Sequence, residues 1–105
     1  MTEKKKMLAG EWFHPNDAEL EQDRTRARHL THRLNVTLKD KDATYLATLR
    51  ELCPGVEAMI RAPFYCDYGY NISIGKGSYV NFNCVFLDLG PIRLGQRCLI
   101  GPGVQ

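Results

Sequence analysis

A six-residue repeat in the second half of the chain limits the possible folds more than any other feature of the sequence. From Ile74 onward, five successive blocks of six begin with an apolar residue if Ile92 and Arg93 are treated as an insertion. The blocks begin at Ile74, Val80, Phe86, Leu94 and Ile100. Their fifth positions are all small, namely Ser78, Cys84, Gly90, Cys98 and Val104. Three six-residue sides make one turn of a triangular coil around a narrow core, so the period predicts stacked parallel β coils. Antiparallel hairpins are the alternative, because Gly and Asn punctuate those as well.

The first half of the chain has a helical pattern instead. Asn16 and Glu19 have the spacing of an N-terminal capping box, which predicts a helix running towards Asn35. Its apolar residues fall near one helical face, at Leu20, Ala27, Leu30 and Leu34. One face of this helix is therefore expected to pack while the charged faces meet solvent. A shorter helix is expected before it, over residues 4–9.

A further helix is predicted to begin at Asp40 or Asp42 and to end before Pro54, which cannot continue a helix. The side chains expected to point inward from it are those of Tyr45, Leu46, Leu49 and Leu52. The sequence thus divides into a helical cap at 1–55 and the first, incomplete coils of a β solenoid at 56–105. The predicted fold class is α+β.

The four cysteines fit the core of such a coil. They are Cys53, Cys66, Cys84 and Cys98, with no CxxC pair among them and no His nearby in sequence. Cys84 and Cys98 fall at the small inward position of their blocks. Projecting the register back through Ala62 and Tyr68 puts Cys66 there too. Buried free thiols are therefore favoured over the alternatives, a disulfide or a metal site.

Composition excludes several classes of function. The 105 residues are 44% hydrophobic and 25% charged, as in a globular protein. The formal net charge of +2 is too small for the basic field of a nucleic-acid-binding protein. No apolar run approaches the roughly 18 residues that span a bilayer, and the start of the chain has no signal-peptide pattern. A cytoplasmic protein that binds neither nucleic acid nor membrane is expected.

Several segments resemble a known enzyme family. Residues 64–72 (FYCDYGYNI) and 80–88 (VNFNCVFLD) resemble bacterial maltose O-acetyltransferases and, less closely, galactoside acetyltransferases. Residues 6–11 (KMLAGE) and 24–28 (RTRAR) look like the helical cap that precedes the repeats in these hexapeptide-repeat sugar O-acetyltransferases. The resemblance covers essentially the whole chain, and the motif at 67–71 is the specific part of it.

The resemblance implies a left-handed parallel β-helix that forms a homotrimer. Acetyl-CoA and a sugar acceptor would meet in clefts between subunits, where a histidine acts as general base on the sugar hydroxyl. The family places that histidine shortly after the Gly-Val that matches Gly103 and Val104, so it is expected beyond Gln105. No catalytic residue is therefore expected within this chain. His14, His29 and His32 all precede the repeats, and none is at the position of the base.

The same resemblance implies acceptor-binding residues. Tyr79 and Asn81 match acceptor-contacting positions, and Asp67 matches a position that other members fill with a small polar residue. Asp88 is expected to point outward, where it could orient the missing imidazole or bind acceptor hydroxyls. Asp17 is a further candidate from the cap. The alternatives are structural: Asp17 would cap a helix, and the other polar residues would stabilise turns or corners.

Three other kinds of protein have features that can be compared with this sequence. The chain could be a non-catalytic interaction module that completes its β-helix with a partner chain. Hexapeptide-repeat carbonic anhydrases need three histidines on the coils, whereas no His follows His32. His29 and His32 are three apart on one helix, but two ligands rarely make a metal site, so no metal is expected. Nucleotidyltransferases with such repeats carry a nucleotide-binding domain, and no Gly-rich phosphate-binding motif occurs here.

Overall fold

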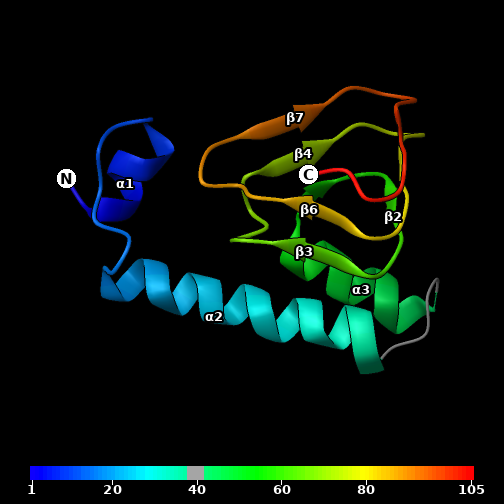
Figure 1. The fold of residues 1–105 in the computed structure, drawn as a ribbon, viewed down its shortest axis with the longest axis horizontal. Coiled ribbons are helices and arrows are strands. Elements are labelled where there is room, and N and C mark those ends of the chain that lie inside the picture. The colour runs from blue at the N-terminus through cyan, green and yellow to red at the C-terminus, as the bar shows by residue number, and fades with distance from the viewer. Residues whose placement is uncertain (38–41) are drawn as a thin grey trace.

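Helices α1 to α3 precede eight short strands in the computed structural model, which describes residues 1–37 and 42–105 (Figure 1). The helical elements are α1 (Glu3–Leu8), α2 (Ala18–His32), the π-helical turn η1 (Arg33–Thr37) and α3 (Ala43–Leu52). The strands are β1 (Gly55–Val56), β2 (Met59–Ile60), β3 (Phe64–Cys66), β4 (Ile72–Ile74), β5 (Tyr79–Val80), β6 (Cys84–Phe86), β7 (Ile92–Leu94) and β8 (Leu99–Ile100). All five strand pairings among the described residues are parallel, so the predicted stacked coils are confirmed over antiparallel hairpins.

The strands stack into three narrow parallel sheets, ordered β1-β4-β7, β2-β5-β8 and β3-β6. Each sheet forms one side of a triangular coil. Tyr79 pairs with Leu99, 20 positions further along the chain, and Phe64 pairs with Cys84 at the same spacing. The coil is therefore two residues longer than three blocks of six, and the extra length lies at one corner.

The predicted position of the insertion was wrong. Ile92 and Arg93 are regular residues of β7 and pair with β4. The longer corner joins the β3-β6 side to the β4-β7 side, through residues 67–71 in one coil and 87–91 in the next. This corner also breaks the register that was projected back through Tyr68. The Tyr68 side chain is buried against the helical cap, next to Met7 and Leu20, rather than in the axial core.

Large and small side chains alternate in the axial core. Phe64 pairs in register with Cys84, and Cys66 pairs with Phe86, so each bulky ring has a small neighbour on the adjoining coil. The two phenylalanine rings meet edge to face, with centroids 5.5 Å apart. Cys84 is buried and Cys66 partly buried, as the repeat predicted for small inward residues. This complementarity lets adjacent coils lie at strand spacing without leaving a void.

The helical cap and the coils pack together in two hydrophobic clusters, the axial core and a smaller cluster of Met7, Leu20 and Tyr68. The predicted face of α2 and η1 is buried throughout, at Leu20, Ala27, Leu30 and Leu34. Tyr45, Leu49 and Leu52 of α3 point inward as predicted, but Leu46 is 37% exposed, so its inward assignment was wrong. Helices α2 and α3 run beneath β3 in Figure 1. The cap therefore closes one end of the β-helix instead of forming a separate body.

Three helix boundaries, both ends of α1 and the start of α2, differ from the predictions by one residue. The cap of α2 is Asp17 rather than Asn16, and α1 covers Glu3–Leu8. The α3 helix begins after Asp42, and the alternative start at Asp40 lies outside the described residues. Aspartate and asparagine are equally good N-cap residues, so the sequence alone does not show which of the two adjacent residues caps α2.

This assignment gives a direct test of the α2 cap. The Asp17 carboxylate accepts hydrogen bonds from the Glu19 and Leu20 amides, at 3.1 and 3.3 Å. We expect Asp17→Ala to lower the free energy of unfolding by about 1 kcal/mol, because two amides lose their acceptor. Asn16→Ala is the matched control and should change it by less than about 0.5 kcal/mol. Urea denaturation measures both, and equal losses would contradict the assignment.

Candidate functional site

The most highly connected polar group at the long corner is the Asp88 carboxylate, which is completely buried. One oxygen accepts hydrogen bonds from the amides of Asp67 and Tyr68, at 3.0 and 2.9 Å. The other accepts from the amides of Gly69 and Asn71, at 2.7 and 3.2 Å. The Asn71 side chain also donates to the Asp88 carbonyl oxygen, at 2.8 Å. The outward orientation predicted for Asp88 was therefore wrong, because the amides at 67–71 turn inward and need a buried acceptor.

Side chains of the same corner point the other way, into the helical cap. The Tyr68 hydroxyl accepts a hydrogen bond from Arg24 at 2.9 Å, and the Tyr70 hydroxyl donates to Asp23 at 2.8 Å. Lys4 forms a 3.1 Å ion pair with Asp23 and lies 4.5 Å from the centre of the Tyr70 ring. The two tyrosine rings stack with centroids 5.4 Å apart. Burial and the bond to Asp23 raise the pKa of Tyr70, which remains a neutral donor.

Asp67 differs from its neighbours in this corner. Its carboxylate is half-buried and accepts no hydrogen bond from any residue in the described parts of the chain. Burial, and then the negative charge of Asp88, raise the pKa of the Asp67 carboxyl, while the Arg24 guanidinium acts in the opposite direction. A partly shielded carboxylate with open lone pairs can accept hydrogen bonds from ligand hydroxyls.

The candidates on β5 and its following corner lie elsewhere. The Tyr79 hydroxyl accepts a 2.9 Å hydrogen bond from Arg61. The Asn81 side-chain oxygen accepts from the Phe82 amide at 2.9 Å, which is a local turn interaction. The asparagine with a left-handed backbone in this corner is Asn83, with φ of 63°, and not Asn81. In Figure 1 the loop between β5 and β6 lies at the right edge of the β-helix, whereas the loops after β3 and β6 lie at the left edge, near α1. The structure therefore brings together Asp67 and Asp88, but separates them from the Tyr79 and Asn81 pair.

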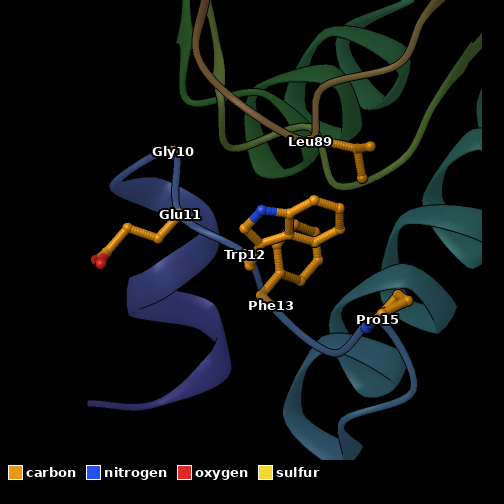
Figure 2. Close-up of a pocket in the computed structure, with 6 residues that line it drawn as sticks. All are labelled: Gly10, Glu11, Trp12, Phe13, Pro15 and Leu89. Carbon is orange, nitrogen blue, oxygen red and sulfur yellow. The ribbon is translucent and has the colours of Figure 1, made fainter.

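An apolar groove that the sequence did not predict is lined by Trp12, Phe13 and Leu89. Its volume is about 410 Å³, and it runs between the segment before α2 and the loop after β6. Figure 2 shows the rings of Trp12 and Phe13 overlapping in the view, with Leu89 above them and Pro15 in the segment that precedes α2. Trp12 is 96% exposed. The signal in the sequence is an aromatic pair in a short segment between Gly10 and Pro15 that has no helical periodicity.

The histidines do not form a site. The His14 amide donates to Glu3 at 2.7 Å, and His29 and His32 lie in the last turn of α2. Within residues 1–37 and 42–105, no three His, Cys, Asp or Glu side chains are grouped so as to hold a metal ion. None of the helices described here has the length and apolar character needed to cross a membrane.

Known proteins share both the sequence and this architecture. Residues 6–56 match a family model described as the maltose acetyltransferase hexapeptide capping motif. Nodulation protein L of Rhizobium meliloti is 46% identical over 108 aligned positions, which cover 99% of this chain and 58% of the relative. A maltose O-acetyltransferase of Clostridium difficile 630 has a TM-score of 0.89 at 36% identity, covering 97% of this chain and 56% of that one. A hexapeptide-repeat acetyltransferase of Vibrio cholerae, solved with acetyl-CoA, has a TM-score of 0.87 at 39% identity, covering 98% and 56%.

A helical cap of this type on stacked parallel coils defines a left-handed β-helix protein of the hexapeptide-repeat class. Within that class, the chain matches the maltose acetyltransferase capping motif at residues 6–56 and is similar to acetyltransferases over nearly its whole length. The predicted family and fold class are confirmed. The chain spans about half the length of the relatives it matches.

Proposed function

We propose that the protein acts in acetyl-CoA-dependent O-acetylation of a sugar hydroxyl, with this chain supplying the cap and first coils. The observation that carries the proposal is the Asp67 carboxylate, which has open lone pairs at the corner motif that resembles the sugar acetyltransferases. The groove lined by Trp12, Phe13 and Leu89 offers apolar and aromatic surface, as small-molecule sites commonly do. The Vibrio cholerae relative supports acetyl-CoA as the donor.

In the proposed reaction, Asp67 accepts hydrogen bonds from acceptor hydroxyls and so orients the sugar. A histidine from coils beyond those described here removes the proton of the reacting hydroxyl. The hydroxyl oxygen attacks the thioester carbonyl carbon, the carbon–sulfur bond breaks, and the CoA sulfur leaves and takes up the proton. Most of the acetyl-CoA site would also belong to those further coils. We further propose a cytoplasmic location, because the reaction consumes acetyl-CoA.

A homotrimer would explain why the candidate acceptor residues lie at two edges of one chain. Asp67 lies at the corner after β3, whereas Tyr79 and Asn81 lie on β5 and the corner after it. In a threefold assembly, one edge of a subunit faces a different edge of its neighbour. We propose that Asp67 and the Tyr79 and Asn81 pair contribute to one site from adjacent subunits. Asp17 remains a candidate, although its carboxylate already caps α2.

The proposal is tested by acetyl transfer to maltose and glucose, measured as release of free CoA thiol. We expect no transfer by the 105-residue chain alone, and transfer by a version extended through the next three or four coils of its gene. In the extended version, Asp67→Asn should raise the acceptor KM about tenfold, because one charged acceptor is lost. Activity of the short chain would overturn the assignment of the base and direct attention to His14, His29 and His32.

A second candidate function is an interaction module that completes its β-helix with another chain. The observation that favours it is an apolar groove of about 360 Å³ lined by side chains of β6, β7 and β8. The residues lining it are Val85, Phe86, Leu87, Ile92, Leu94, Ile100, Val104 and Gln105. Co-expression with a separate chain of the remaining coils distinguishes the two candidates. A stable complex of the two purified chains would support the module, and failure to associate would exclude it.

A further inference from the structure

We infer that Asp88 is a positioning residue, whose buried carboxylate holds the backbone of residues 67–71 so that Asp67 is presented to the acceptor. This inference rests on the proposed function, because it gives Asp88 a task in acceptor binding. It replaces the expectation that Asp88 itself contacts the sugar.

The first argument is the number and direction of the bonds. Four amides within five residues donate to the two oxygens of one side chain, at 2.7 to 3.2 Å. Hydrogen bonds to a charged acceptor are stronger than those between neutral groups. Because the amides of Asp67 and Tyr68 share one oxygen, the peptide planes on both sides of the Asp67 Cα are fixed. The direction of the Asp67 side chain follows from those planes.

The second argument is that the Asp88 carboxylate cannot contact an acceptor directly. Its side chain has no solvent exposure. Neither of the ion pairs found among the described residues involves it, so its charge is stabilised by backbone N–H groups. A buried carboxylate with four donors has no free lone pair directed towards solvent. It can affect an acceptor only through the residues that it holds.

The third argument is the pattern of side-chain bonds along the corner. Tyr68 and Tyr70 are bonded to α2, and Asn71 is bonded to the Asp88 carbonyl oxygen. Gly69 has no side chain. Asp67 alone among these five described residues has a side chain without a hydrogen bond in the chain. The corner is thus held from both sides, and its one open polar group is the one proposed to bind the acceptor. Such support of a binding group by a second set of residues is what a precise site requires.

The test compares Asp88→Asn with two further variants. Asn keeps the size of the side chain but replaces one oxygen with an NH₂ group, which cannot accept from the pair of amides that it faces, either Asp67 and Tyr68 or Gly69 and Asn71. Asp67→Asn removes the proposed acceptor contact itself. Tyr45→Phe is the matched control for lost stability, since it removes a buried 2.7 Å hydrogen bond to the Ile60 carbonyl oxygen from a different part of the cap.

The first measurement needs no activity. Amide hydrogen exchange of the 105-residue chain, followed by NMR, should become at least about tenfold faster in Asp88→Asn at one of the two amide pairs, Asp67 with Tyr68 or Gly69 with Asn71, because the pair that faces the NH₂ group loses its acceptor. The amides of Arg61 and Tyr79, which bond to the adjoining coil, should keep their exchange rates. Unchanged exchange at both of these amide pairs, or equal acceleration throughout the chain, would overturn the inference.

The second measurement uses the extended version with acetyl-CoA and maltose. Asp88→Asn should raise the acceptor KM about tenfold, as Asp67→Asn does, while the acetyl-CoA KM stays within about twofold. Tyr45→Phe should change neither. An equal rise in both KM values would mean a general structural role and would overturn the inference. If the extended wild type transfers no acetyl group while the amide result holds, the proposed function fails, but Asp88 still positions the Asp67 corner.

Discussion

Replacing Gly69 with alanine is expected to lower the free energy of unfolding by about 3 kcal/mol or more, one of the two largest single losses predicted for this chain. Gly69 has a φ of +89°, which side chains other than glycine rarely adopt. A Cβ built on it would overlap the carbonyl oxygen of Leu52 and lie 2.8 Å from the Leu52 Cδ1. The end of α3 and the Asp67 corner would have to separate, and the Gly69 amide would lose its 2.7 Å bond to Asp88.

Gly10→Ala separates backbone strain from this steric overlap. Gly10 has a similar φ of +78°, but a Cβ there would meet no atom within 4 Å. Its substitution should cost only the strain of a left-handed residue, about 1 to 2 kcal/mol. Both variants can be compared by urea denaturation. If Gly69→Ala costs no more than Gly10→Ala, the close contact between Leu52 and the corner does not limit substitution at Gly69.

The repeating part of the fold could be predicted from the sequence because its cause is local. Each coil needs a bulky apolar residue at a regular interval, and that interval is visible as Ile74, Val80 and Phe86. All three are buried. The corner lengths could not be predicted in the same way. A longer corner changes the period by two residues without changing the alternation inside a strand, so cutting the sequence into sixes assigned Ile92 and Arg93 to the wrong place.

The orientation of Asp88 is the clearest example of what the sequence left open. Position within a six-residue block predicted an outward carboxylate, but side-chain direction at a corner depends on the path of the neighbouring coil. The amides that Asp88 binds belong to residues 17 to 21 positions earlier, at 67–71. Only the stacked coils bring them together. The sequence predicted acceptor-binding roles for both Asp67 and Asp88. The structure shows that they differ in burial, because Asp88 is completely buried and Asp67 is half-buried.

The groove lined by Trp12, Phe13 and Leu89 could not be predicted from the sequence, for a related reason. Trp12 and Phe13 lie in a segment with no periodic pattern, and Leu89 lies 76 positions after Phe13 in an unrelated loop. Neither segment predicts the other. The groove forms only where the segment before α2 and the loop after β6 come together in the folded chain.

Phe64 is expected to be a second large contributor to the stability of the joined cap and coils. Its side chain is fully buried in the shared core, and its ring meets that of Phe86 edge to face. Its backbone is held from the cap as well, because the Asn35 side chain accepts from the Phe64 amide and donates to its carbonyl oxygen, both at 2.9 Å. We expect Phe64→Ala to lower the free energy of unfolding by about 3 to 5 kcal/mol, through lost burial and the cavity left beside Cys84.

Phe82→Ala is the control for this prediction. Phe82 is 44% exposed in the corner after β5, so removing its ring should cost less than about 1 kcal/mol. Phe64→Leu should lie between the two, since it fills part of the cavity. Because single domains are stable by only about 5 to 15 kcal/mol, Phe64→Ala should leave a substantial unfolded population in mild urea. Similar losses for Phe64→Ala and Phe82→Ala would mean that the core between the first two coils is not closely packed, and that the cap is held to them mainly by polar contacts such as Asn35 with the Phe64 backbone.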